Sequence, residues 1–148
     1  FDFYGALAEE NGVTLRLEGS GQVTGDRLML RRAIGNLLSN ALRYTPSGGR
    51  IVVTVSVVRD SPDAEAVHLS VENTGEPIPS EHLSRLFDRF YRVDASRRHS
   101  GDGAGLGLAI TRSILRSHGG DIEGRTGKGC NIFEMWIPTS IVTPRSAD

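Results

Sequence analysis

Three polar side chains recur at helical spacing in one segment of the chain. Asn36, Asn40 and Arg43 stand at i, i+4 and i+7, within an arc of about 60° on a helix of 3.6 residues per turn. An asparagine carbonyl oxygen is a ligand that Mg²⁺ accepts, and a guanidinium group binds phosphate. The spacing therefore indicates a helix face that meets a ligand, and a solvated helix face is the alternative.

A glycine-rich segment offers a place for phosphate. Glycines occupy positions 101, 103, 105 and 107, directly before a helical pattern. Backbone N–H groups at the start of a helix can converge on an anion. A dinucleotide-binding fold is not expected, because the polar run 97–100 rather than a strand precedes the glycines, and the chain has no P-loop. A flexible loop is the alternative.

The segment VENTGEPIP places Asn73 at the end of a predicted strand. An amide is both donor and acceptor, so it can pair with the edge of a nucleobase. Gly75 would let the backbone approach the base. An ordinary turn formed by asparagine and glycine is the alternative.

The segment LFDRFYR, at 86–92, has an aromatic cluster that we expect to anchor a mobile stretch from 92 to 103. Arg92, Arg97 and Arg98 lie in this stretch and would reach phosphates if it closed over a ligand. A solvated basic loop is the alternative.

Hydrophobic periodicity predicts the elements that must position these residues. Helices are expected over 1–11, 26–45, 80–86 and 106–118, a brief extended segment over 22–24, and strands over 13–18, 51–58, 66–72, 121–125 and 131–137. The order of elements predicts an α/β (α+β) two-layer sandwich. Its mixed, mostly antiparallel five-stranded sheet would be covered on one face by three helices.

Length and charge restrict the possible functions. The chain has 148 residues, which favours one domain, and its net charge of −1 gives no reason to expect nucleic acid or an anionic membrane as a partner. Cys130 is the only cysteine and cannot form an intrachain disulfide, which fits a reducing compartment. None of the four histidines belongs to a set with metal-ligand spacing.

Four of these motifs, in this order, resemble the boxes of the catalytic ATP-binding domain of bacterial sensor histidine kinases. The segment NLLSNALRYTP is similar to the N box, VENTGEPIP to the G1 box, LFDRFYR to the F box and GAGLGLAI to the G2 box. The resemblance runs from about residue 13 to residue 138 and implies the Bergerat (GHKL) fold. Residues 1–12 would be a lead-in from a preceding domain, and residues 139–148 a tail.

The resemblance implies that the domain binds ATP with Mg²⁺. By position, Asn40 would be the Mg²⁺ ligand, Asn36 and Arg43 would lie beside the phosphates, and Asn73 would read adenine. Asn36, Asn40 and Arg92 are the implied catalytic residues. The other implied nucleotide-binding residues are Tyr44, Gly75, Ile78, Arg97, Arg98, Gly103, Gly105, Leu106, Gly107 and Leu108.

The sequence departs from the family pattern D-x-G-x-G at two positions. Asn73 replaces the acidic residue, and Pro77 replaces the second glycine, which stiffens the loop and removes an N–H group. In gyrase-type ATPases a glutamate activates water one turn before the Mg²⁺-binding asparagine. Asn36 holds that position here and cannot take a proton, so the resemblance implies phosphoryl transfer to another acceptor.

The implied acceptor is a histidine of a dimerising helix hairpin, from which a response-regulator aspartate receives the phosphoryl group. The four histidines here are followed by Leu, Leu, Ser and Gly, and none has the acidic neighbour of the family motif. We therefore expect the phosphoacceptor domain to precede Phe1, a monomeric fragment, a homodimeric parent, and a cytoplasmic location in a membrane-anchored sensor. A catalytically silent nucleotide-binding module and an anti-sigma-type serine kinase are the alternatives.

Overall fold

The computed structural model describes residues 2–61, 64–83, 85–88 and 107–139. Its elements are α1 (Asp2–Glu10), β1 (Thr14–Gly19), α2 (Arg27–Tyr44), β2 (Arg50–Ser61), β3 (Ala64–Thr74), α3 (Ser80–Leu83), α4 (Gly107–Ser117), β4 (Asp121–Gly127) and β5 (Cys130–Pro138). They follow the order predicted from the sequence. One expectation on local structure was wrong, because α3 ends three residues before Leu86. The segment 22–24, expected to be extended, belongs to no helix or strand.

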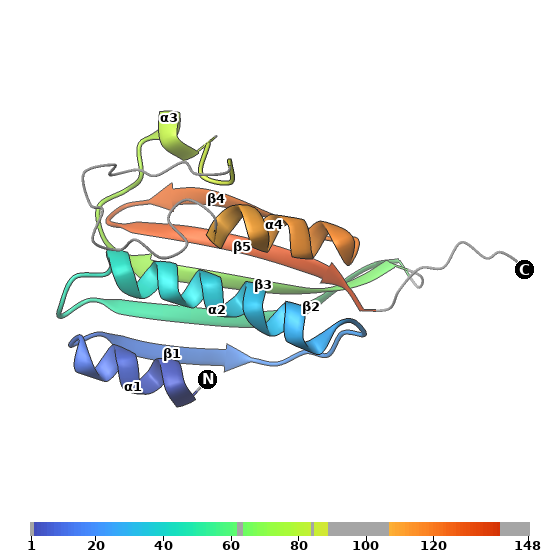
Figure 1. Cartoon of the computed structure of the whole chain (residues 1–148), viewed down its shortest axis with the longest axis horizontal. Helices are drawn as coiled ribbons and strands as arrows, with labels where there is room; N and C mark the ends of the chain where they lie inside the picture. Colours follow the sequence, from blue (N-terminus) through green and yellow to red (C-terminus); the bar gives the residue numbers. More distant parts are fainter. Residues whose placement is uncertain (1, 62–63, 84, 89–106, 140–148) are drawn as a thin grey trace, which may run out of the picture.

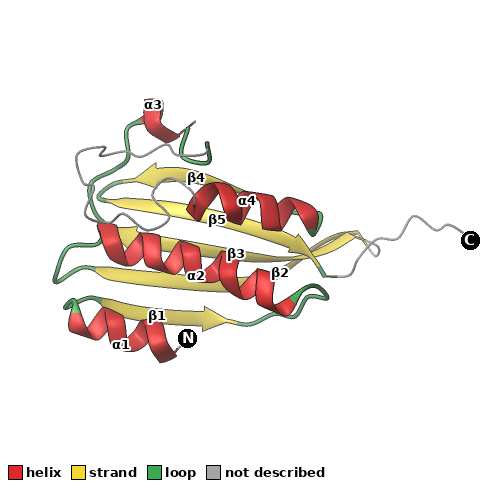
Figure 2. Cartoon of the chain, in the orientation of Figure 1, coloured by secondary structure: helices red, strands yellow, loops and turns green. Residues whose placement is uncertain are grey.

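The five strands form one sheet in the order β1-β2-β3-β5-β4. β1 pairs in parallel with β2, and the other three pairs are antiparallel. The predicted mixed, mostly antiparallel sheet is therefore confirmed. The longer helices α1, α2 and α4 lie over one face, and the short α3 lies beyond β4 (Figures 1 and 2).

Alternation along the strands builds the core between the sheet and these helices. β5 buries every second residue from Asn131 to Ile137, and β3 does the same from Val67 to Asn73. The buried apolar side chains that meet between the layers include Leu37, Leu38, Val53, Leu69, Val71, Ile114, Leu115, Ile122, Phe133 and Met135. Asn73 and Asn131 lie at the same end of these two rows of buried residues, and they are partners in the β3–β5 register.

The two long helices α2 and α4 are antiparallel neighbours, and their ends are joined by specific hydrogen bonds. Asp26 caps α2 by accepting a hydrogen bond from the Met29 N–H at 3.1 Å. The backbone N–H of Asp26 donates to Nε2 of His118, just after α4, at 3.0 Å. Because this contact fixes the end of α4 beside the start of α2, the start of α4 faces the C-terminal half of α2.

None of the helices among the described residues is long and apolar enough to span a membrane.

The turn between α4 and β4 requires glycine, which gives a test of the fold. A Cβ at position 120 would lie 1.8 Å from the backbone oxygen of Trp136, whereas a Cβ at Gly5 in α1 would meet nothing within 4 Å. Gly120→Ala should therefore destabilise the protein by about 2 kcal/mol or more. Gly5→Ala, the matched control, should stabilise it by roughly 0.5 kcal/mol through helix propensity. Chemical denaturation would measure both, and equal effects would contradict this packing of the turn.

Candidate functional site

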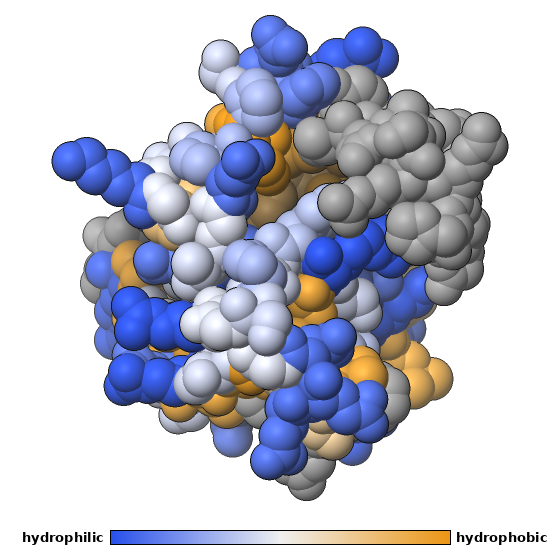
Figure 3. Space-filling view, turned by 90° about the vertical axis from the view of Figure 1, so that its left-hand side faces the viewer, coloured by the Kyte–Doolittle hydropathy of each residue, from blue (hydrophilic) through white to orange (hydrophobic). Residues whose placement is uncertain are grey.

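The predicted site residues that the structure describes gather at one end of the molecule. α2 and β3 end there, and α4 begins there (left-hand end of Figure 1). Figure 3 looks onto this end and shows hydrophobic surface in a recess between hydrophilic groups. The site is therefore assembled from segments that are far apart in the sequence.

The helix face predicted to meet a ligand is joined directly to the glycine segment. Asn36 Nδ2 donates a hydrogen bond to the backbone oxygen of Gly107 at 3.2 Å. One turn later Asn40 is half-buried, and its side chain has no hydrogen-bond partner within the described part of the chain. Arg43 and Tyr44 are exposed at the end of the helix. The Asn36 amide thus lies beside the start of α4.

Asn73, predicted to read a nucleobase, has a buried side chain near the end of β3. It is 3% exposed, and its Nδ2 donates to the backbone oxygen of Thr74 at 3.3 Å. Its Oδ1 accepts no hydrogen bond from any described residue. A buried carbonyl oxygen without a donor is costly, so this atom is suited to accept from a bound group.

Gly75 brings the loop after β3 close to the end of α2. A Cβ there would lie 3.0 Å from the backbone oxygen of Tyr44, so a larger residue would push the loop away. Ile78 and Leu108 are partly buried and pack against the core. The other predicted nucleotide-binding residues, Arg92, Arg97, Arg98, Gly103, Gly105 and Leu106, lie outside the described residues.

The donor set fits a nucleotide better than a metal held by protein alone. No group of three His, Cys, Asp or Glu side chains in the described ranges is arranged to bind a metal ion. The half-buried Asn40 amide can supply one oxygen ligand, and Mg²⁺ commonly takes its other ligands from phosphates and water. A cation at this site would therefore arrive with a phosphate ligand.

Sequence reasoning missed a buried asparagine on the opposite side of the loop. Asn131 is 3% exposed, and its amide hydrogen-bonds to the backbone at Glu76 and at Ile78. No motif marked it, because it looks like any other residue of a strand that alternates buried and exposed positions. Only the pairing of β5 with β3 places it beside this loop.

The predicted aromatic anchor is present in its described part. Leu86 is buried, and the Phe87 ring packs edge-on against Phe133 with the centroids 6.3 Å apart. The Arg112 guanidinium lies over the Phe87 ring, 4.4 Å from its centroid. The same Arg112 Nε donates to Asp121 Oδ1 at 3.0 Å, so one side chain joins the anchor, α4 and β4. Phe90 and Tyr91 lie outside the described residues.

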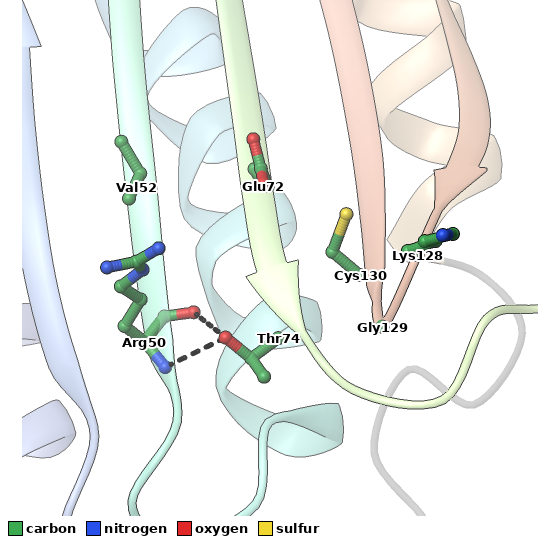
Figure 4. Close-up of a pocket in the computed structure, with 7 residues that line it drawn as sticks. All are labelled: Arg50, Val52, Glu72, Thr74, Lys128, Gly129 and Cys130. Atoms are coloured by element: carbon green, nitrogen blue, oxygen red, sulfur yellow. Dashed lines mark hydrogen bonds between the residues drawn. The ribbon is translucent and has the colours of Figure 1, made fainter.

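A separate hollow of about 230 Å³ lies on the helix-free face of the sheet. It is lined by Arg50, Val52, Glu72, Thr74, Lys128, Gly129 and Cys130, none of which was predicted to bind nucleotide (Figure 4). Burial raises the pKa of the Cys130 thiol, and the neighbouring Glu72 carboxylate raises it further. Cys130 therefore remains a thiol at neutral pH and is not an activated nucleophile.

Comparison with known proteins identifies the family. Residues 25–141 match the family model described as histidine kinase-, DNA gyrase B-, and HSP90-like ATPase. The chain belongs to this family. Among curated relatives, the sensor histidine kinase CusS of Escherichia coli K12 is 58% identical over 139 residues, which cover 93% of this chain and 28% of CusS. The chain thus spans about a quarter of the length of such relatives.

Solved structures of this family share the fold. The mycobacterial sensor histidine kinase MprB superposes with a TM-score of 0.77 at 27% identity, covering 95% of this chain and 94% of that chain. Full-length ShkA, solved in complex with AMPPNP, superposes with a TM-score of 0.76 at 25% identity over 96% of this chain and 29% of its own. The resemblance to sensor-kinase catalytic domains and the Bergerat-type sandwich are therefore both confirmed.

Asp121 gives a pH-dependent test of how α4 is held to β4. Burial alone would raise the pKa of this carboxyl, but hydrogen bonds from the Ile122 N–H, Arg116 and Arg112 outweigh it and leave the pKa below its usual value of 3.8. A lowered folded-state pKa adds stability above the unfolded-state pKa, and this stability disappears as the pH falls through the folded-state pKa.

Asp121→Asn should therefore cost about 1 kcal/mol at pH 7. The difference from wild type should shrink below about pH 4. Urea unfolding between pH 7 and pH 2.5 measures it. A difference that stays constant over this range would mean that the charge of Asp121 does not hold the two elements together.

Proposed function

We propose that this domain binds Mg-ATP at the end formed by α2, α4 and the loop after β3, and transfers the γ-phosphoryl group to a histidine of a separate phosphoacceptor domain. The hydrogen bond from Asn36 to Gly107 carries the proposal, because it joins the asparagine face of α2 to the start of the helix that follows the glycines. The AMPPNP bound to ShkA supports a nucleotide at this kind of domain. The phosphoryl group would then pass to an aspartate of a response regulator.

Different residues of the described part would bind the base, the metal ion and the phosphates. Asn73 Oδ1 accepts a hydrogen bond from the amino group of adenine at the buried end of the site. The oxygen of Asn40 would coordinate Mg²⁺, and the bound ion would supply charge neutralisation for the transferring phosphoryl group. Asn36 and Arg43 orient the phosphates from α2. Arg92, Arg97 and Arg98 would add positive charge from the segment outside the described residues.

Catalysis in this proposal depends on positioning and electrostatics. Asn36 stands where a water-activating glutamate occurs in gyrase-type ATPases, and an amide cannot accept a proton. Phosphoryl transfer needs little more than alignment and stabilisation of charge. The site therefore favours transfer to a histidine presented by the partner domain over hydrolysis. The curated relatives are several times longer than this chain, which leaves room for such a partner domain. The parent kinase would be a homodimer through that domain.

A catalytically silent nucleotide-binding module is the second candidate. It is favoured by the neutral Asn73 in place of an acidic residue and by Pro77 in the same loop. An uncharged acceptor binds the adenine amino group less strongly than a carboxylate does. Such a module would bind ATP and transfer nothing.

Transfer of radiolabelled phosphate separates the two candidates. The chain would be incubated with γ-labelled ATP, Mg²⁺ and the phosphoacceptor domain of the CusS relative, and acid-labile label on that domain would be counted. We expect labelling by wild type and at least a tenfold loss in Asn40→Asp, about 1.4 kcal/mol of transition-state stabilisation. Asn11→Asp, the same change at an exposed position after α1, is the control. ATP binding without labelling would favour the silent module.

Removal of the metal tests the role of Asn40. Chelation should abolish transfer, and titration with Mg²⁺ should restore it. Asn40→Ala should need a higher Mg²⁺ concentration for half-maximal labelling, by about tenfold, because one ligand is lost. Asn11→Ala should follow the wild-type curve. An unchanged Mg²⁺ requirement in Asn40→Ala would exclude Asn40 as the ligand.

A further inference from the structure

Both polar atoms of the buried Asn131 amide form hydrogen bonds with one loop. Oδ1 accepts a hydrogen bond from the backbone N–H of Ile78 at 2.8 Å, and Nδ2 donates to the backbone oxygen of Glu76 at 2.9 Å. Both distances are those of well-formed hydrogen bonds. The side chain therefore engages the backbone on both sides of Pro77, as a peptide group of a neighbouring strand would.

Pro77 explains why a side chain is needed there. Proline has no N–H group and restricts the residue before it to extended backbone. The flanking carbonyl of Glu76 and N–H of Ile78 both turn toward β5, where Asn131 satisfies them. The start of the loop is held from the same side, because the Gly75 N–H donates to the backbone oxygen of Gly129 at 3.0 Å.

The loop held in this way begins two residues after Asn73. Asn131 is the register partner of Asn73 across β3 and β5, and both side chains are buried at the same end of the core. At the other side of the loop, Gly75 approaches the backbone of Tyr44. The amide of Asn131, together with the Gly129 carbonyl, thus holds the loop between Asn73 and α2.

We propose that Asn131 is a positioning residue for the nucleotide base: its two hydrogen bonds hold the loop 75–78 in the conformation that forms the wall of the adenine pocket. This inference rests on the proposed function. Asn131 acts through the loop, so it governs affinity for ATP and the preference for adenine, while the rate of transfer from bound ATP does not depend on it.

The geometry specifies asparagine at this position. Alanine leaves the Glu76 carbonyl and the Ile78 N–H without their partner. Aspartate keeps an acceptor for Ile78 but places a carboxylate oxygen against the Glu76 carbonyl, which repels it. Both variants should release the loop, and aspartate should do so without loss of side-chain volume.

Nucleotide binding by the 148-residue chain is the first test. Displacement of a fluorescent ATP analogue by ATP and by GTP would be measured for wild type, Asn131→Ala and Asn131→Asp. Both variants should bind ATP at least tenfold more weakly and should lose most of the preference for ATP over GTP. In the labelling assay at saturating ATP, their rates should stay within twofold of wild type. A variant with unchanged affinity and preference would overturn the proposal.

Met135→Ala is the matched control for stability. Met135 is buried on the same face of the same strand, two alternate positions further along, and its register partner is Leu69. It should lower the melting temperature at least as much as Asn131→Ala while leaving ATP affinity within twofold. If Met135→Ala weakened ATP binding as much as the Asn131 variants, the effect would be one of stability and the proposal would fail.

Hydrogen exchange without nucleotide tests the loop independently of the proposed function. The Ile78 amide should exchange slowly in wild type and at least tenfold faster in Asn131→Ala, with the amides of β3 unchanged. Rapid exchange of Ile78 in wild type would overturn the proposal. The Ile78 amide could be protected while wild type binds no ATP. In that case the proposed function fails, and so does the inference about the base. The conclusion that Asn131 holds the loop would stand.

Discussion

The antiparallel pairing of β3 with β5 is the constraint on which the candidate site depends. Nine consecutive residue pairs, from Ala66 with Pro138 to Thr74 with Cys130, fix the register of these two central strands. Since side chains alternate between the faces, this register places two rows of apolar residues against α2 and α4. It also brings Asn73 and Asn131 together where the rows end. A shift of β5 by one residue would turn Asn131 to the helix-free face and leave Asn73 without this partner.

The packing of α2 against α4 adds the second half of the site. The helices are joined at one end by the backbone of Asp26 and the ring of His118, and at the other by Asn36 and Gly107. Between these contacts lie Leu30 and Ala33 on α2 and Ile114 and Leu115 on α4, all of which are buried. An apolar interface with a polar contact at each end sets the axial position of α4, and so the place where the chain arrives after the glycines.

Amide groups and charges have separate tasks in the described part of the molecule. The predicted site residues of α2 and β3 with buried or half-buried side chains, Asn36, Asn40 and Asn73, are amides, which can bind without the cost of burying charge. Ion pairs are concentrated elsewhere, and Asp121 with Arg112 and Arg116 holds α4 to β4. Binding of a triphosphate would therefore draw its positive charge from Mg²⁺, from Arg43 and from the arginines outside the described residues.

Local sequence patterns were sufficient to predict the helices and strands and the side of α2 on which the site residues lie. The spacing of Asn36 and Asn40 determined that both lie on one side of α2, because the helical repeat is a local property. Alternation in 66–72 and 131–137 likewise determined the strands, although α3 is shorter than its cap and first turn suggested. The glycines before Gly107 indicated where α4 starts, and its first residue, Gly107, meets α2.

Tertiary structure decided which residues of different elements come into contact. The hydrogen bonds of Asn36 and of Asn131 join residues more than 50 positions apart. The burial of Asn73 depends on strands that meet only in the folded sheet. The sequence alone determined which residue types stand on which face of each element, since that follows from backbone geometry. The strand order and the helix packing decided which faces meet. Both are selected by burial of the whole apolar surface and by no local preference.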